Sequence, residues 1–180
     1  MTGSLSKEII IQQLNQAITD FISFTKNIND ELFYTQPGDK WSVAENVAHL
    51  IIATKSTITA YILPKFIVRW YAGKPNRPSR SYDELVAKYQ LKLKNGGKAG
   101  GRFIPKQISN HQGKENLLQD FSTAMKKLVT AIQYKWNDNQ LDQYIAPHPL
   151  LGKITLRELC YFTIYHTYHH LDIIKGRSLG

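Results

Sequence analysis

The sequence has few cysteines and no long apolar run, and both absences limit what the protein can be. Cys160 is its single cysteine, so no disulfide can form within the chain. A reducing, cytoplasmic location is therefore expected. No apolar stretch reaches the roughly 18 residues that a membrane-spanning helix needs, and the polar N-terminus is unlike a signal peptide. We expect neither a membrane segment nor a membrane partner.

Acidic residues are also scarce. The chain has 14 Asp and Glu against 23 Lys and Arg, which gives a formal net charge of +9. Nucleic-acid binders usually gather such charge on one element, whereas here the cations are spread along the chain. Their densest stretch, Lys88 to Lys106, is rich in glycine. We interpret it as a solvated loop, with a lid that attracts anions as the alternative, and we expect no nucleic-acid partner.

The 180 residues show no internal repeat, long linker or low-complexity tract, and 42 % of them are hydrophobic. This length and composition predict a single globular domain over residues 1–180.

Apolar residues recur at three- and four-residue spacing in four long segments, which predicts amphipathic helices. No convincing alternating strand pattern is present, so we predict an all-α antiparallel four-helix bundle. The long helices are expected at about Ser6 to Ile28, from Ser42 to Pro64 with apolar residues continuing to Tyr71, at Lys114 to Trp136 and at Thr155 to Lys175. A shorter helix is expected at Ser81 to Lys92, and loops at Asn95 to Gly101 and Asn137 to Lys153.

Three motifs predict where helices begin and end. Ser42 with Glu45, and Thr155 with Glu158, have the Ser/Thr-x-x-Glu spacing of a capping box, in which each side chain satisfies the other residue's free backbone N–H. Gly176 is a plausible C-terminal stop for the last helix.

Histidines provide the strongest functional signal. His166 and His170 are four residues apart, so on a helix they lie on one face, one turn apart, as paired zinc-binding histidines do. His169 offers a competing pair with His166. The apolar stripe of the last helix places His170 inside it and His166 on its edge, whereas His169 falls further round the helix. We therefore predict that His166 and His170 point inward and that His169 lies at the rim.

A metal site needs a third ligand, and His49 is the best candidate because it lies in the most apolar helix. Both nitrogens of a buried imidazole need partners, and a metal on one nitrogen with a hydrogen bond on the other would supply them. Glu45, one turn earlier, is a candidate for that hydrogen bond. The alternative is that all three histidines are hydrogen-bonded core residues. We interpret Cys160 as core packing and His148 as a loop residue near the mouth of the bundle.

The order of these features resembles the DinB-like family, which includes YfiT-like metal-dependent hydrolases. The resemblance spans about Leu14 to Lys175. Three segments carry it: Trp41-Ser42-x-x-Glu45-x-x-x-His49-Leu50, then His148 to Thr155 with its Gly-x-x-Thr, and finally His166-x-x-x-His170-Leu171.

The resemblance implies an up-down-down-up bundle with a long crossover between its second and third helices, which the stretch from Pro64 to His111 fits. It also implies that His49, His166 and His170 hold one divalent metal ion, with zinc or nickel expected, and that the chain forms a homodimer. Characterised relatives include transferases and isomerases that use low-molecular-weight thiols. The glycine- and lysine-rich segment from Asn95 to Lys106 departs from the family pattern and is of a kind that covers a site.

Three neutral histidines leave a coordination position open, which is typical of catalytic rather than structural zinc sites. The expected function is therefore a metal-dependent transferase or hydrolase acting on a small molecule, with thiol transfer favoured by the resemblance. Glu45, Glu158 and Tyr165 are weak candidates for a general base. A non-catalytic helical scaffold or dimerisation domain with structural histidines is the alternative.

Overall fold

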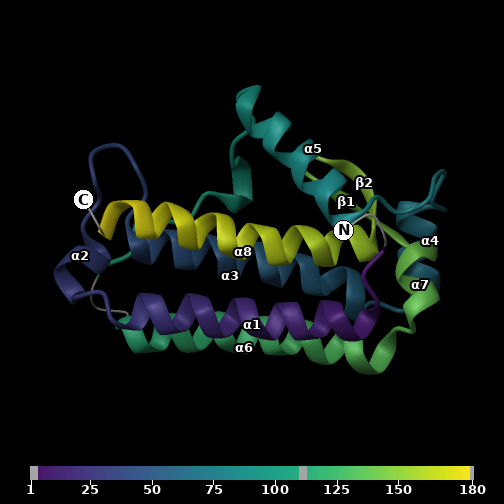
Figure 1. Cartoon of the computed structure of the whole chain (residues 1–180), viewed down its shortest axis with the longest axis horizontal. Helices are drawn as coiled ribbons and strands as arrows, with labels where there is room; N and C mark the ends of the chain where they lie inside the picture. The colour runs from purple at the N-terminus through teal and green to yellow at the C-terminus, as the bar shows by residue number, and fades with distance from the viewer. Residues whose placement is uncertain (1–3, 110–112, 179–180) are drawn as a thin grey trace.

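A computed structural model describes residues 4–109 and 113–178, and its main feature is a bundle of four long helices (Figure 1). These are α1 (Lys7–Lys26), α3 (Val43–Ile62), α6 (Lys114–Lys135) and α8 (Leu156–Ser178). The shorter elements are α2 (Asp30–Tyr34), α4 (Lys65–Ala72), α5 (Tyr82–Lys94), the 3₁₀ turn η1 (Gly101–Phe103), α7 (Asp138–Gln143), β1 (Ile145–His148) and β2 (Gly152–Thr155). The predicted helical bundle is confirmed.

Hydrogen bonds between helix ends define the directions of the four helices. Trp136, at the end of α6, donates from Nε1 to the carbonyl of Tyr61 near the end of α3, at 2.9 Å. The Tyr61 hydroxyl donates to the carbonyl of Leu156 at the start of α8. Lys7, at the start of α1, donates from Nζ to the carbonyl of Gln133 near the end of α6. Helices α3 and α6 therefore run parallel to each other and opposite to α1 and α8.

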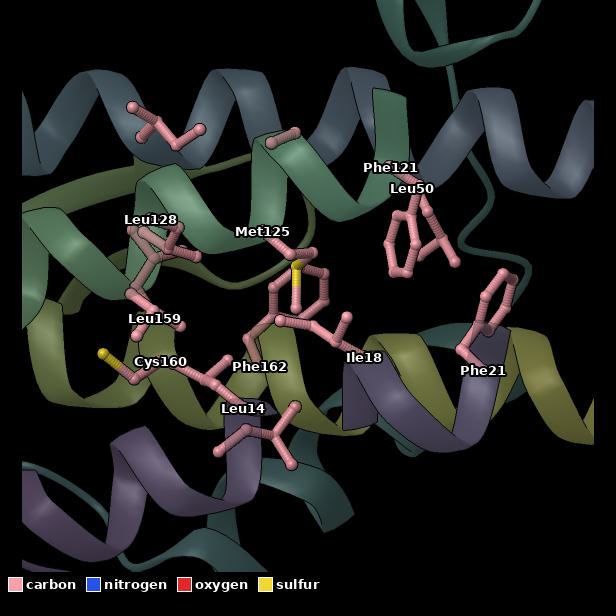
Figure 2. Close-up of a cluster of buried hydrophobic side chains, with 14 of the residues drawn as sticks. Leu14, Ile18, Phe21, Leu50, Phe121, Met125, Leu128, Leu159, Cys160 and Phe162 are labelled. Atoms are coloured by element: carbon pink, nitrogen blue, oxygen red, sulfur yellow. The ribbon is translucent and has the colours of Figure 1, made fainter. Parts of the chain in front are cut away.

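The inward faces of the four helices meet in one apolar core (Figure 2). Phe21 of α1 and Phe121 of α6 are fully buried, and their ring centroids lie 4.9 Å apart. Burial of side chains this large is the main favourable contribution to folding. The core makes a rigid frame between α3 and α8, the two helices that carry the candidate site.

In the chain between α3 and α6, α4 lies at one end of the bundle and α5 lies over α8 (Figure 1). Pro64 lacks the N–H that would continue α3, and α4 starts after it at a bend of 109°. Helix α5 then packs against α8. The described part of this crossover ends at residue 109, so His111, its predicted end, lies outside the described residues.

Within the described residues no single helix is long and apolar enough to cross a membrane. Only the bent pair of α3 and α4 has that length and composition when the two helices are taken together.

The segment from Asn137 to Lys153 contains helix α7 and strand β1 and the start of β2, so the prediction of a loop there and the expectation of no strands were wrong. Strands β1 and β2 pair antiparallel, with Ile145 opposite Thr155 and His148 opposite Gly152. Four-residue strands are too short to show a convincing alternation in the sequence. Tertiary packing stabilises the two strands, because Ile145 and Thr155 are buried at one end of the hairpin.

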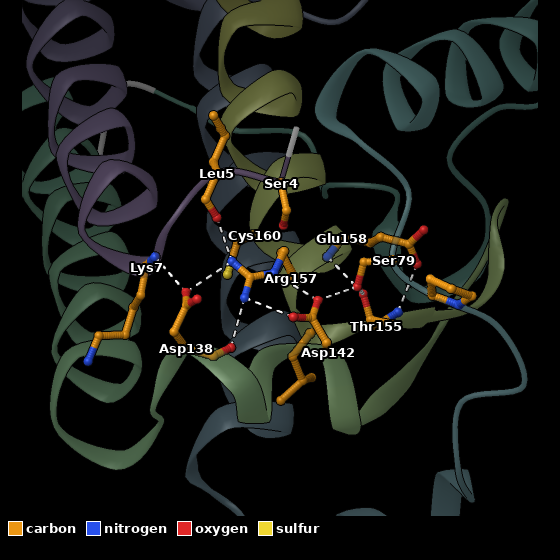
Figure 3. Close-up of polar contacts among 12 residues, drawn as sticks. Ser4, Leu5, Lys7, Ser79, Asp138, Asp142, Thr155, Arg157, Glu158 and Cys160 are labelled. Carbon is orange, nitrogen blue, oxygen red and sulfur yellow. Dashed lines mark hydrogen bonds and ion pairs between the residues drawn. The ribbon is translucent and has the colours of Figure 1, made fainter. Parts of the chain in front are cut away.

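Arg157 ties this end of the bundle together (Figure 3). Its guanidinium is buried and donates to the carboxylates of Asp138 and Asp142 and to the carbonyl of Leu5. Asp142 in turn accepts a hydrogen bond from Ser79, in the chain before α5. The network joins the N-terminal segment, α7, α8 and the crossover.

Both predicted capping boxes are present. Ser42 and Glu45 exchange backbone and side-chain hydrogen bonds, as do Thr155 and Glu158. The predicted stop at Gly176 was wrong, because α8 continues to Ser178. Glycine disfavours a helix interior by only about 1 kcal/mol relative to alanine, so a single glycine does not force an end.

His148 is expected to make the hairpin sensitive to acid. Its Nδ1 accepts the N–H groups of Leu150 and Leu151, each at 3.2 Å, and burial lowers its pKa to about 4. Because this pKa is lower in the folded state than in the unfolded chain, the contribution of His148 to stability is complete above about pH 6.5 and falls as pH approaches 4. An asparagine at this position offers an acceptor that does not titrate. Between pH 7 and 4.5 we expect the wild type to lose about 2 kcal/mol more than His148→Asn in urea unfolding.

The comparison isolates His148, since the other histidines titrate equally in both proteins. Parallel loss of stability in the two proteins would contradict the assignment.

Candidate metal centre

His49 lies near the start of α3, one turn after the capping box that fixes where this helix begins. The helix is buried on most sides, and His49 is only 5 % exposed. His49 therefore projects from a buried helix inside the bundle rather than from a loop.

His166 and His170 project from α8 toward His49. They are buried together with the apolar stripe of this helix. His169 is half-buried, stacks on Tyr165 and lies outside the group of three. His166 and His170 thus point inward and His169 lies outside, as the angle around the helix predicted.

The three imidazoles converge through their Nε2 atoms. Nε2 of His166 lies 3.2 Å from Nε2 of His49 and 3.1 Å from Nε2 of His170. One ligand atom from each residue lies within 4.8 Å of the others. Residues 117 positions apart in sequence therefore meet at one centre.

The other ring nitrogens fix the tautomers of two of these histidines. Nδ1 of His49 lies 2.7 Å from the carbonyl oxygen of Phe103, which can only accept, so His49 carries its hydrogen on Nδ1. Nδ1 of His170 lies 2.7 Å from Oδ1 of Asn46. The amide of Asn46 is oriented by its own Nδ2, which donates to the carbonyls of Trp41 and Ser42, so His170 also donates from Nδ1.

In these tautomers the Nε2 atoms of His49 and His170 each carry a lone pair and no hydrogen. Nε2 of His49 and Nε2 of His170 both face Nε2 of His166, which can carry at most one hydrogen. His166 therefore satisfies only one of its two neighbours, and within the described chain the second lone pair faces another nitrogen. Buried polar atoms are normally paired, so this geometry calls for an electrophile at the centre.

Burial also keeps the three rings neutral. It lowers the pKa of His49, and the hydrogen bond to Phe103 only partly opposes this shift. It lowers the pKa values of His166 and His170 further, and the neighbouring histidines add to the effect. Neutral imidazole is the form that binds metal.

The spacing of the nitrogens fits a metal ion. Imidazole nitrogens at about 2.0–2.1 Å from a tetrahedral zinc ion lie roughly 3.3 Å apart. The two closest nitrogen pairs, at 3.1 and 3.2 Å, are near this value. The hydrogen bonds of His49 and His170 to Phe103 and Asn46 are of the kind that orient metal-binding histidines.

The glycine-rich segment contacts this centre, which fits the alternative of a covering segment better than the preferred interpretation of a solvated loop. Gly101 has a φ of 55°, which favours glycine, and it begins the turn that presents the Phe103 carbonyl to His49. Arg102 donates to the hydroxyl of Ser56 on α3. The segment is therefore attached to the site through both its backbone and a side chain.

Glu45 does not support His49, and that prediction was wrong. Its carboxylate accepts the backbone N–H of Ser42 and both short bonds from Gln36. Phe103 takes the place expected for Glu45. No sequence signal could identify this partner, because it is a backbone oxygen 54 residues away. The sequence does contain a signal for Asn46, the partner of His170, because it is an amide side chain in an apolar helix, one turn before His49.

The remaining candidates lie outside the centre. Cys160 is fully buried, contacts the Tyr61 hydroxyl and has its pKa raised to about 12 by burial, as core packing implies. Burial alone would raise the pKa of Glu158, but hydrogen bonds from Arg77 and from backbone N–H groups lower it on balance. Tyr165 accepts a hydrogen bond from Gln90.

A cavity of about 1080 Å³ adjoins the three histidines. Its walls are mainly apolar, and they include Phe162, whose ring stacks on His166 at 4.7 Å. Four cations line it, Lys40, Lys98, Arg102 and Arg177, whereas Asp39 is its one acidic residue in the described chain. Such a cavity suits a small molecule with an apolar part and a negative charge.

Sequence comparison identifies the family: residues 13–174 match the DinB superfamily, and the chain belongs to it. No curated protein matches. The solved structure of TT2238, described as a four-helix bundle protein, is similar with a TM-score of 0.59 and 12 % identity, over 95 % of this chain and 99 % of that one.

YfiT from Bacillus subtilis is similar with a TM-score of 0.58 and 14 % identity, over 94 % of this chain and 84 % of that one. It is described as a probable metal-dependent hydrolase with an unusual four-helix bundle topology. At such low identity these two likenesses establish the shared bundle fold, and the family match supports the resemblance seen in the sequence.

Proposed function

We propose that this protein is a metal-dependent enzyme whose single divalent ion is held by His49, His166 and His170. The observation that carries the proposal is that the Nε2 lone pairs of His49 and His170 both face His166, which can satisfy only one of them. Zinc and nickel are the expected ions, because both accept imidazole ligands. Three protein ligands leave a coordination position for a reactant, and the adjoining cavity gives that reactant space.

A structural role for the histidines is the rival explanation. A core histidine needs each nitrogen to face a partner of the opposite kind. Here the partners of two Nδ1 atoms are settled, and both opposite nitrogens face a third imidazole. A scaffold would gain more from an apolar residue at any of these positions, so the arrangement favours metal binding.

Within this function we favour thiol transfer over hydrolysis. Metal hydrolases usually pair the ion with a carboxylate that acts as general base. In the described chain the only carboxylate lining the cavity is that of Asp39, which is exposed. The ion would supply Lewis acidity, which lowers the pKa of a thiol at the open position and makes it a nucleophile without a protein base.

The chain's own residues have the other roles in this reaction. The four cations lining the cavity would attract an anionic thiol cosubstrate, and the apolar walls would hold an electrophilic partner while excluding water. Asn46 and Phe103 would keep two imidazoles in the tautomer that leaves Nε2 free.

Metal content tests the centre. Protein purified without chelator or affinity tag is expected to contain about one equivalent of metal by plasma mass spectrometry. His166→Ala and His170→Ala should each weaken binding by 100-fold or more, on the order of 3 kcal/mol, because two imidazoles hold an ion poorly. His169→Ala is the matched control from the same helix turn and should retain the metal.

Full metal loss in His169→Ala with retention in His166→Ala would show that the wrong face of α8 was assigned. Wild-type protein that takes up neither zinc nor nickel would exclude the centre altogether.

A paired activity screen tests the reaction class. Metal-loaded protein is offered a chromogenic aryl halide with glutathione or bacillithiol, and separately a chromogenic ester without thiol. We expect conjugation of the aryl halide that requires both thiol and metal and that disappears in His170→Ala. Ester cleavage without thiol would instead establish a hydrolase, and inactivity of the loaded protein with both reagents would favour the scaffold.

A further inference from the structure

A second cavity, of about 540 Å³, lies between the chain that follows α4, helix α5 and the β-hairpin. It adjoins the larger cavity, since Ala72 and Ile145 line both. Its lining in the described chain contains five cations and no acidic residue. The cations are Lys74, Arg77, Arg80, Lys88 and Lys153.

One buried carboxylate behind this cavity occupies its two arginines. Glu158 accepts two hydrogen bonds from Arg77, at 2.8 and 2.9 Å, and one from the guanidinium of Arg80 at 3.1 Å. It also accepts the backbone N–H groups of Arg80 and Thr155. Its lone pairs are therefore used, and its single negative charge cannot balance the remaining cations.

The three lysines have no carboxylate partner in the described chain. Lys153 donates instead to the carbonyl of Ala72 at 2.8 Å, and Lys88 to the carbonyl of Leu151 at 3.4 Å. Each ammonium has three N–H groups, so on each of these side chains two have no acceptor among the residues that the structure describes. Burial, and after it the charges of Arg80 and Arg77, lower the pKa of Lys88, whereas the charge of Glu158 partly opposes this shift.

Lys74 and Lys153 are exposed and Lys88 is half-buried, and five cations that share one buried carboxylate give the cavity a positive potential that attracts anions. We propose that this cavity binds a phosphate-type dianion, held by Lys88 and Lys153 and supported by Lys74 and the two arginines. The carbonyl bonds of Lys88 and Lys153 position their ammonium groups in advance, so fewer rotamers are lost on binding. Charge-assisted hydrogen bonds of this kind are about twice as strong as neutral ones.

Such a dianion has two possible sources, a free phosphate compound or the phosphate of a lipid headgroup. Trp70 and Tyr71 lie in the last turn of α4, where they line the larger cavity, and they are 85 % and 71 % exposed. Aromatic side chains of this kind lie at membrane interfaces when a lipid is bound. A soluble phosphate bound in the smaller cavity would not need these side chains, which line the larger cavity, so their substitution distinguishes the two sources.

Inorganic phosphate tests the site itself by titration calorimetry and by its effect on thermal unfolding. We expect phosphate to bind the wild type and raise its melting temperature. The double variant Lys88→Gln, Lys153→Gln should bind at least roughly tenfold more weakly, because two charge-assisted bonds are lost. This variant loses two hydrogen bonds to backbone carbonyls as well as the repulsion between cations, so its own melting temperature without phosphate is the reference for its phosphate-induced shift.

Two controls make the result specific. Lys126→Gln, Lys127→Gln removes the same charge from exposed positions on α6 and should bind phosphate like the wild type. His170→Ala should also bind phosphate normally, so failure of the metal site and failure of this site are distinguishable. Equal losses of phosphate binding in both lysine variants would overturn the proposal. Absence of phosphate binding by the wild type would overturn it too if the protein also fails to bind vesicles that contain a lipid phosphate.

Vesicles identify the source. Sedimentation is compared for phosphatidylcholine vesicles with and without phosphatidic acid. Binding that needs phosphatidic acid, and that falls in both Trp70→Ala and the Lys88, Lys153 double variant, supports a lipid phosphate. Binding of inorganic phosphate without vesicle binding supports a soluble phosphate compound. Binding of neither probe overturns the site.

Discussion

The structure depends on one constraint: two buried imidazoles have already used their N–H groups, so their lone pairs must face inward. His49 donates to a backbone carbonyl of the covering segment, and His170 donates to Asn46 of the facing helix. One ligand nitrogen from each of the three neutral imidazoles then lies within 4.8 Å of the others, close enough for a single metal ion to bind all three.

The rest of the fold positions that centre. Antiparallel packing of α3 against α8 brings an early residue of one helix to the later turns of the other. Phe21, Phe121 and their neighbours hold the two helices from the far side (Figure 2). The Arg157 network fixes the opposite end of α8 (Figure 3), so the helix that carries two histidines is anchored along its length. The crossover, in turn, supplies the cover over the site and the wall of the second cavity.

Much of this arrangement can be predicted from the sequence, because it depends on local patterns. Helical periodicity located the four long helices, and the capping boxes fixed the starts of α3 and α8. The angle around the helix was sufficient to separate His169 from His166 and His170. These predictions succeed where a residue's neighbours along the chain decide its environment.

The remaining features depend on contacts between distant segments. Phe103 contributes a backbone oxygen, which any residue type offers, so only the folded chain reveals its role. Glu45 was a reasonable partner for His49 by spacing, but Gln36 and Ser42 claim its carboxylate. The hairpin has strands of four residues, and its pairing becomes visible only in three dimensions. The oligomeric state and the predicted homodimer stay predictions.

X-ray absorption spectroscopy at the metal edge of the zinc-loaded protein tests the central claim most directly, because it reports the atoms bound to the ion. The account predicts three nitrogen ligands at about 2.0–2.1 Å with the outer-shell scattering of imidazole, plus a light atom at the remaining position. A sulfur ligand at about 2.3 Å, or a shell without imidazole scattering, would contradict it.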